Sequence, residues 1–555
     1  MHLQLWSHCV TVLFFALRSQ NAAAHNNEHI NELIIDLPNG QIRGRDDDYF
    51  YSYESIPYAE PPLGPLRFES PKSYRTKWLD TFDATREPVE CMQWDQFTVG
   101  VDKLHGVEDC LTVSVYKPKL QAGIKRQKYA LPVLVLLHGG AFMYSSGKVN
   151  GHDYLMRHGR FIVVKINFRL GPLGFLSTED AIIAGNFGLK DQRLALKWIK
   201  ANIANFGGDP ERITVLGFSS GGVAVHLHML AQQNFTEYAY AAASISGTAF
   251  NPWAITHKSR ERAFQLARNL KCPDVNSSQA IKDCLQRKPA TDIVRGVQDF
   301  LVLGYNPFTT FGPSIESVEV EDAFLTRSPL QIVKSGNFAQ LPWLVSYCAQ
   351  DGGYNAAELL QRNRWGEELI EVFNDRWYDL APYNLFYKDT MQSVEQMDDY
   401  SVALKRRYLG SKDFSIDTYL NVQRMYTDVL FRDGIEQAIR LQRIYGRSPI
   451  YAYVYDNPAE QNMGHMLSGR QDVEMGTVHG DDFFLIFNRS GRSNIRADEK
   501  VISRKFIKML DDFAVKSDSL AFGGCKFVDN FGKDEYQLMF ITRNACENKQ
   551  VATLP

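Results

Sequence analysis

One short segment constrains the fold more than any other part of the chain, because a strand, a serine and a helix follow one another without a break. The strand is ITVL (213–216), the turn is GFSSG (217–221) and the helix is GVAVHLHML (222–230). Glycines on both sides of Ser219 avoid the clashes that a Cβ atom would make with neighbouring backbone at so sharp a turn. The turn raises the serine Oγ above the sheet, close to helix N–H groups that favour negative charge. The segment predicts an α/β fold with Ser219 as a nucleophile, and a turn that only packs is the alternative.

The rest of the chain continues this alternation of strands and helices. Four further runs are short, apolar and rich in β-branched or aromatic residues, at 131–137, 161–166, 341–347 and 450–455. Their nearly continuous apolarity indicates strands that are covered on both faces, as in a parallel sheet. Two apolar helical stripes occur at 190–204 and 501–513. Because no repeat, linker or low-complexity tract divides the chain, we expect a single large domain with a mostly parallel central sheet flanked by helices.

The amino terminus has the features of a secretory signal. The apolar run CVTVLFFAL (9–17) is too short to span a bilayer, and it is followed by the small residues Ala22, Ala23 and Ala24. We expect residues 1–24 to be removed and residues 25–555 to form the secreted domain, with a buried helix of the mature fold as the alternative. No later stretch has about 20 consecutive apolar residues, so no membrane anchor is expected.

Cysteines, sequons and charge agree with that location. Six cysteines fall into three sequence-local pairs and Cys348 stands alone in an apolar run, which favours three small disulfide loops and one buried thiol, although spacing leaves the connectivity open. The sequons at Asn234, Asn276 and Asn488 are candidate glycosylation sites once secretion is assumed. Lys plus Arg (61) nearly balance Asp plus Glu (64), so no nucleic-acid partner is expected. No Cys/His cluster has zinc-like spacing, so no metal is expected. The six paired cysteines are Cys91, Cys110, Cys272, Cys284, Cys525 and Cys546.

A second glycine-rich turn, His138-Gly139-Gly140-Ala141-Phe142, follows the strand at 131–137. Small residues let the backbone approach a substrate. We expect the N–H groups of Gly140 and Ala141, together with that of Ser220, to form an oxyanion hole, in which each donor contributes about 10²–10³ in rate. A tight turn without this role is the alternative.

A serine nucleophile also needs a base, and enzymes with this serine turn carry their acid and then their histidine after the serine. His479 lies in the polar, glycine-bounded loop GTVHGDD (476–482) and is the preferred base, with His465 as the alternative. The earlier His138, His226 and His228 are expected to be structural.

The acid is less constrained, because many carboxylates lie between Ser219 and His479. Asp351 is the best local candidate, since its turn QDGG follows the strand at 341–347 and could present a carboxylate at the sheet edge. The residues alone leave this choice open.

Together the motifs resemble the type-B carboxylesterase/cholinesterase family, and within it the secreted β-esterases of fruit flies. The resemblance implies an α/β-hydrolase fold and a secreted carboxylesterase that hydrolyses a small-molecule carboxylic ester through an acyl-enzyme, without a cofactor. It implies the triad Ser219–Asp351–His479 and the oxyanion donors Gly140, Ala141 and Ser220. It also implies the disulfides Cys91–Cys110, Cys272–Cys284 and Cys525–Cys546, with Cys348 free. The matching segments are SIPYAEPPLGPLRF (55–68), EDCL (108–111), the HGGAF loop, NFRLGPLGF (167–175), NFGLKDQRLALKWI (186–199), GFSSG, the Asp351 turn and GTVHGDD.

Three positions depart from the family pattern. Phe218 stands where Glu or His is usual, and we expect it to narrow the pocket entrance. Ser220 replaces an alanine and Ala141 a third glycine, but both keep their backbone donors. We expect these changes to affect the substrate preference and to leave the catalytic mechanism unchanged.

Other functions on the same fold make different demands. A catalytically silent adhesion protein typically lacks the serine or the histidine, and both are present. A cholinesterase would place an aromatic platform late in the loop that begins at Cys91, whereas Trp94 follows that cysteine closely. A hormone-selective esterase remains open, as does the oligomeric state.

Overall fold

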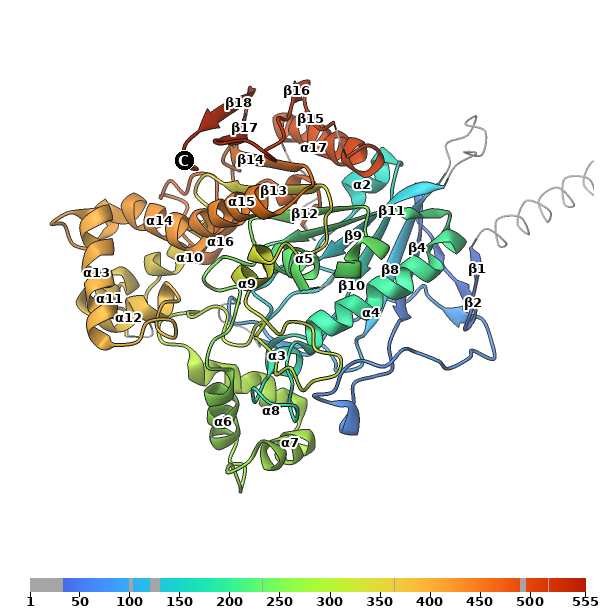
Figure 1. Cartoon of the computed structure of the whole chain (residues 1–555), viewed down its shortest axis with the longest axis horizontal. Helices are drawn as coiled ribbons and strands as arrows, with labels where there is room; N and C mark the ends of the chain where they lie inside the picture. The colour runs from blue at the N-terminus through green and yellow to red at the C-terminus, as the bar shows by residue number, and fades with distance from the viewer. Residues whose placement is uncertain are drawn as a thin grey trace, which may run out of the picture.

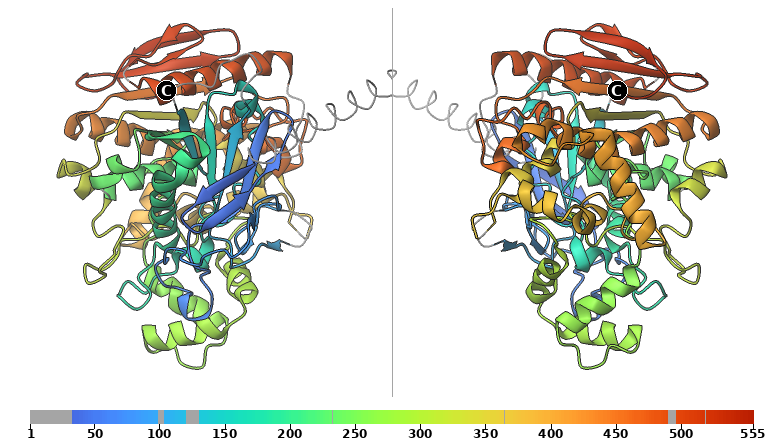
Figure 2. Two further views of the ribbon diagram at one scale, coloured as in Figure 1. Left: turned by 90° about the vertical axis from the view of Figure 1, so that its right-hand side faces the viewer. Right: turned by 90° about the vertical axis from the view of Figure 1, so that its left-hand side faces the viewer.

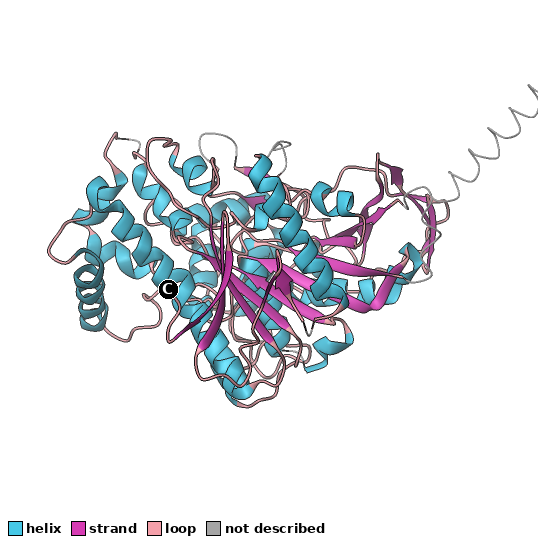
Figure 3. Cartoon of the chain, turned by 90° about the horizontal axis from the view of Figure 1, so that it is seen from above, coloured by secondary structure: helices cyan, strands magenta, loops and turns pink. Residues whose placement is uncertain are grey.

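The apolar runs expected as strands lie side by side in one sheet of the computed structural model, which describes residues 33–98, 103–119, 130–231, 233–363, 365–489, 496–517 and 519–555. The expected signal segment, residues 1–24, lies outside the described residues. The sheet has eleven strands and twists through the middle of the molecule (Figure 3). From edge to edge they are β18 (Cys546–Val551), β17 (Tyr536–Thr542), β14 (Ile450–Asp456), β13 (Trp343–Cys348), β12 (Ala241–Ile245), β11 (Gly208–Phe218), β9 (Leu131–Leu137), β10 (Ile162–Ile166), β8 (Thr112–Pro118), β4 (Phe50–Pro57) and β3 (Arg45–Asp46).

The centre of this sheet is parallel, which confirms the expected architecture. Every neighbouring pair from β10 through to β17 runs in the same direction, and Val135 of β9 lies opposite Val164 on one side and Val215 on the other. Antiparallel strands close both ends, with β8, β4 and β3 at one edge and β18 at the other. The carboxyl ends of the parallel strands therefore meet at one edge, where loops can converge on a site.

The two faces of the sheet belong to two different hydrophobic clusters, because side chains alternate along each strand. In β9, Val133, Val135 and Leu137 point to one face, whereas Leu134 and Leu136 point to the other. Both sets are buried, and this explains why the strand reads as a continuous apolar run.

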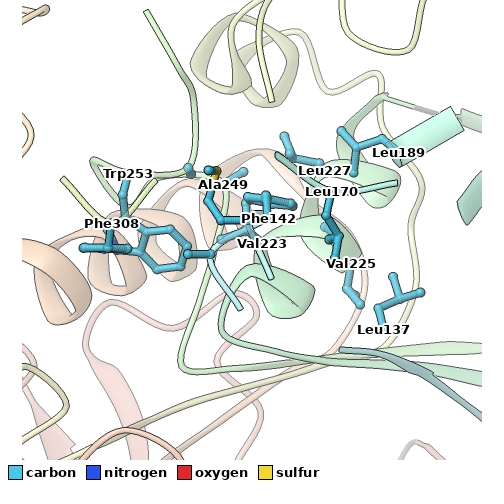
Figure 4. Close-up of a cluster of buried hydrophobic side chains, with 14 of the residues drawn as sticks. Leu137, Phe142, Leu170, Leu189, Val223, Val225, Leu227, Ala249, Trp253 and Phe308 are labelled. Carbon is cyan, nitrogen blue, oxygen red and sulfur yellow. The ribbon is translucent and has the colours of Figure 1, made fainter. Parts of the chain in front are cut away.

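Helices cover each face. The first face packs against α4 (Phe187–Asn202), α5 (Ser220–Ala231), α9 (Pro329–Lys334) and α15 (Asp433–Tyr445). Figure 4 shows part of this cluster, with Val225 of α5 near Leu137 of β9 and Val223 near Phe142. The second face packs against α2 (Asp153–His158) and α17 (Ala497–Val515), whose buried Ile502, Phe506 and Met509 form the stripe expected from the sequence.

Further helices extend the molecule away from the sheet. Figures 1 and 2 show α6 (Ser259–Asn269), α7 (Ser278–Arg287) and α8 (Ala290–Arg295) together at one end. On another side lie α11 (Leu369–Asp375), α12 (Trp377–Asn384), α13 (Val394–Leu409) and α14 (Tyr419–Thr427) (Figure 1). Short helices α3 (Gly171–Phe175), α10 (Gly353–Ala356) and α16 (Met463–Ser468) follow strands or loops near the sheet.

Three disulfides connect neighbouring segments, and they join the pairs implied by the resemblance. Cys91–Cys110 closes the loop before β8, Cys272–Cys284 ties the segment after α6 to α7, and Cys525–Cys546 ties β16 (Cys525–Lys526) to the edge strand β18. Cys348 is a buried free thiol at the end of β13. Burial, and next the charge of Asp482, raise the pKa of this thiol.

Candidate active site

The serine of the GFSSG turn lies between the end of β11 and the start of α5. Its φ is 59°, in the left-handed region that side chains rarely adopt, so the turn holds Ser219 in a strained conformation. A Cβ at Gly217 would lie 2.0 Å from the carbonyl oxygen of Gly221, and one at Gly221 would lie 2.0 Å from that of Leu137. Glycine is therefore required on both sides of the serine.

Neighbouring strands fix this conformation. The N–H of Ser219 donates to the carbonyl of Ile245 at the end of β12 (2.8 Å), and its carbonyl accepts from the N–H of Val223 in α5 (3.0 Å). A Cβ at Gly247 would lie 2.2 Å from the Ser219 carbonyl oxygen, so the chain after β12 packs directly against the turn.

The HGGAF loop lies beside the serine, as is required if Gly140 and Ala141 are to act with Ser220 as oxyanion donors. A Cβ at Gly139 would lie 3.1 Å from the Cβ of Ser219. Gly140 and Ala141 have φ values of 105° and 56°, so this loop also turns through the left-handed region. Within the described residues, the N–H groups of Gly140, Ala141 and Ser220 donate to no acceptor and are free for a ligand.

His479 and Asp351 are brought together from loops 128 residues apart in sequence. Nδ1 of His479 lies 2.8 Å from Oδ1 of Asp351, and the carboxylate is fully buried. The other oxygen of Asp351 accepts from the N–H of Cys348 at 3.0 Å, which fixes the carboxylate at the end of β13. With Nδ1–H donating to Asp351, Nε2 of His479 is the basic nitrogen. Across the described part of the chain, Ser219 Oγ and His479 Nε2 form no hydrogen bond, and such bonds often tighten only with substrate present.

Aromatic rings surround the His479 imidazole on several sides. Their centroids lie 4.6 Å away for Phe218, 4.9 Å for Phe431 and 5.3 Å for Tyr354. Phe218 also stacks on Phe483, at 4.5 Å and an interplanar angle of 8°. The expectation that Phe218 narrows the pocket entrance is therefore wrong: its side chain points to the α17 face of the sheet, where it is 9% exposed and packs against the histidine.

Sequence reasoning missed a buried carboxylate behind the histidine. Asp482 accepts from the N–H of Phe483 (2.7 Å) and from the hydroxyl of Tyr453 (2.9 Å). Burial, and next the charge of Asp351, raise the pKa of Asp482 to about 6. The available signal was the pair of aspartates in HGDD directly before the apolar run FFLIF, which predicts that at least one of them is buried.

The earlier histidines are buried in polar contacts. Nδ1 of His226 accepts from the N–H of Ala249 (3.1 Å), Nε2 of His228 contacts Oε1 of Gln192 (3.0 Å), and His138 stacks on Phe168. Burial lowers the pKa of His138 to about 4 and the pKa values of His226 and His228 to about 3. The alternative base, His465, caps helix α16 with Asn462.

The three sequons differ in accessibility. Asn234 and Asn276 are exposed. Asn488 is half-buried, its Nδ2 donates to Asp153 Oδ2 (3.0 Å), and its Oδ1 accepts from the N–H of Asp153 (3.1 Å).

The described residues contain neither a membrane-spanning helix nor a metal-binding cluster. None of the helices there is long and apolar enough to cross a bilayer. Nor do those residues contain a group of three or more His, Cys, Asp or Glu side chains that could hold a metal ion.

The chain is similar to known esterases along nearly its whole length. The model of the carboxylesterase family matches residues 31–554. Esterase-5A of Drosophila miranda is 54% identical over 99% of this chain and 98% of its own length, and Esterase P of Drosophila melanogaster is 52% identical over the same shares. The crystal structure of juvenile hormone esterase from Manduca sexta, with OTFP covalently attached, superposes with a TM-score of 0.76 at 22% identity. It covers 93% of this chain and 96% of its own, and this likeness supports the fold.

Proposed function

The chain belongs to the carboxylesterase family and is a carboxylesterase, and on this premise we propose that Ser219, His479 and Asp351 are its catalytic triad. The observation that carries the proposal is the buried hydrogen bond between His479 Nδ1 and Asp351 Oδ1, 2.8 Å long, at the strand edge that also carries the strained Ser219 turn. Such a bond selects the tautomer in which Nε2 can accept a proton.

The proposed reaction has two stages. His479 Nε2 takes the proton of Ser219 as Oγ attacks the ester carbonyl, and the N–H groups of Gly140, Ala141 and Ser220 hold the negative charge on the carbonyl oxygen. The imidazolium then protonates the leaving alcohol. Water attacks the acyl-enzyme by the same route and releases the carboxylate, while Asp351 stabilises the charged imidazole.

Replacement of the nucleophile tests the triad. Ser219→Ala should lower kcat for a p-nitrophenyl ester by about 10⁴–10⁶ with the fold intact. Ser220→Ala is the matched control: it keeps the backbone donor and removes an Oγ that has no hydrogen-bond partner among the described residues, so kcat should stay near that of the wild type. Near-normal turnover by Ser219→Ala, or an organophosphate label on another residue, would reject the assignment.

The substrate we propose is a neutral small-molecule ester. Trp94, the only nearby tryptophan for a choline platform, is half-buried in β6 (Gln93–Trp94), and Lys103 Nζ lies 5.0 Å from its ring centroid. A protein cation already occupies that ring, and this supports an uncharged ester over a cationic one. Hydrolysis of butyrylthiocholine faster than that of an uncharged thioester of equal length would contradict this preference.

We also propose that the enzyme is secreted after cleavage near Ala24 and that residues 25–555 form the mature domain. Three disulfides support an oxidising compartment. Mass spectrometry of protein from the culture medium should find a mature terminus at His25, and retention of residues 1–24 would contradict cleavage.

A further inference from the structure

A groove on the α17 face of the sheet is lined by several basic side chains, of which His158 contacts the carboxylate of Asp511 (Nε2 to Oδ2, 3.4 Å). It lies between α2 and α17, which pack side by side at the top of Figure 1, and it has a volume of about 570 Å³. None of its lining residues is acidic. They are Tyr154, Arg157, His158, Lys500, Ser503, Arg504 and Ile507.

The three permanent cations of this groove are available to a ligand. Arg157, Lys500 and Arg504 are exposed, and among the described residues none of them has a carboxylate within 4.0 Å. Other basic residues nearby are paired, as Arg160 is with Asp511 at 2.8 Å. Lys500 and Arg504 are one helical turn apart, so their charges follow one another along α17 at a spacing of about 6 Å.

The arginines are held in place although they are exposed. The Arg157 guanidinium lies over the ring of Tyr49, 4.4 Å from its centroid. Arg504 Nε donates to the carbonyl of Lys500 at 3.1 Å. A cation held in one position loses less conformational entropy when it binds an anion.

The groove continues into a second cavity. That cavity, of about 580 Å³, shares Tyr154 and Arg157 with the groove and adds the cations Arg45, Lys148 and Lys165. It also contains three carboxylates: Glu54 accepts from the Tyr116 hydroxyl, Asp153 accepts from Asn488, and Glu87 pairs with Lys148 at 3.7 Å. Arg45 is paired as well, with Asp47 at 3.0 Å, so the unpaired permanent charge of the two hollows lies mainly in the groove. The Tyr154 hydroxyl at the junction is buried and has no partner among the described residues. A ligand longer than a single ion can therefore lie across both hollows.

We propose that this groove binds a linear acidic polysaccharide, whose sulfate or carboxylate groups pair with Arg157, Lys500 and Arg504. Guanidinium groups bind such anions through two parallel hydrogen bonds. Tyr154 and Ile507 give the floor apolar surface that suits the face of a sugar ring. The whole chain has a formal net charge of −3, so attraction of a polyanion requires this local surface rather than the overall charge.

The shape and composition of the groove disfavour other polyanions. A flat bilayer surface is bound best by cations that project from the protein, whereas these cations line a hollow between two helices. A single-stranded nucleic acid needs several exposed aromatic rings on which bases stack, whereas the lining of this groove offers one phenol ring, that of Tyr154, and the half-buried imidazole of His158.

Binding of a size-defined heparin oligosaccharide to the full secreted protein tests the proposal. We expect saturable binding that weakens with added NaCl, because each ion pair releases counterions. The triple variant Arg157→Gln, Lys500→Gln and Arg504→Gln should bind about tenfold or more weakly, and the slope of log Kd against log salt should fall by about 2–3. Arg504→Gln alone should weaken binding by a smaller factor, which keeps the test usable if the triple variant folds poorly.

A matched control distinguishes the effect of the charges in the groove from the effect of the net charge of the protein. Arg407, Arg424 and Arg440 line a different cavity together with Asp433 and Glu436. Replacement of these three by Gln removes the same charge and should leave binding unchanged. Equal loss in both triple variants would overturn the proposal, as would the absence of saturable binding. Tighter binding to phosphatidylserine vesicles or to single-stranded DNA would overturn it as well. Hydrolysis of p-nitrophenyl acetate should be unchanged in every variant, so failure here is distinct from failure of the triad.

Discussion

The ring of Phe218 lies 4.6 Å from the imidazole of His479, tilted by 33°. Phe218 is joined through one peptide bond to the nucleophile. The strand that presents Ser219 therefore also provides a ring that packs against His479. The same ring stacks on Phe483, four residues beyond His479. One side chain therefore connects the two loops whose relative position the reaction requires.

Phe218→Leu tests this connection. Loss of the ring leaves the imidazole less confined, and we expect kcat to fall by about 3- to 10-fold with a smaller change in KM, because near-attack geometry is sensitive to small displacements. Steady-state kinetics with a p-nitrophenyl ester measures it. Phe484→Leu is the control, since that ring packs against Phe218 at 6.1 Å and has no ring contact with His479 within the described residues. Equal kinetic losses in both variants would mean that Phe218 acts only through general packing.

Substitutions at the two expected oxyanion donors of the HGGAF loop should have very different effects on kcat. A Cβ at Gly140 would lie 2.0 Å from the carbonyl oxygen of Tyr144, at a φ of 105°. Gly140→Ala must therefore move the backbone, and kcat should fall by about 10²–10³ as a donor turns away. Ala141→Gly relaxes a left-handed alanine and keeps its N–H, so kcat should stay within about threefold. The prediction fails if Gly140→Ala retains full turnover.

The buried Asp482 predicts a pH dependence of stability. Its pKa is raised to about 6 in the native state, mainly by burial, and returns to about 4 on unfolding. Between about pH 4 and pH 6 the native state holds a proton that the unfolded state has lost, so the stability contributed by this group is present at low pH and is lost as pH rises through the window.

Asp482→Asn should lack this loss. The Tm of the variant relative to the wild type should rise between about pH 4 and pH 6, equivalent to about 3 kcal/mol of unfolding free energy, and level off above that range. Thermal scans at stepped pH values measure it, with the exposed Asp534→Asn as control. A Tm difference that is independent of pH would contradict the assignment.

Glycan occupancy should follow the accessibility of the three sequons. We expect glycans on the exposed Asn234 and Asn276. Asn488 should be bare, because its amide is bonded to Asp153 and a Cβ at Gly151 would lie only 2.4 Å from its Nδ2. Peptide mass spectrometry after enzymatic deglycosylation in heavy-oxygen water measures the glycan occupancy of each site. A glycan on Asn488 in active enzyme would contradict the packing described for that loop.

The central sheet and the serine turn follow from local patterns. The run at 131–137 coincides with β9, and continuous apolarity gave the right answer because both faces of that strand are covered. The glycines around Ser219 are required because a Cβ atom at their positions would clash with nearby backbone. The turn can therefore be recognised from the sequence without knowledge of the rest of the fold.

Contacts between distant loops could not be read in the same way. Asp351 and His479 meet because β13 and β14 are neighbours in the sheet, and the QDGG turn made Asp351 a candidate without excluding the other carboxylates between Ser219 and His479. The direction of Phe218 has a similar cause. Alternation places it on the same face as Leu216, but only the assembled sheet shows that this face also holds the histidine loop.

The edge strand β18 has a consequence for the behaviour of the protein in solution. An outer strand presents unpaired backbone groups that can recruit strands from other molecules and start aggregation. Here the outer strand reads CENKQV, is mostly exposed, and carries Glu547 and Lys549. The opposite edge, β3, is only two residues long. The charged side chains of β18 and the short length of β3 both disfavour pairing with a strand of another molecule. We therefore expect the protein to resist aggregation through the edges of its sheet at high concentration.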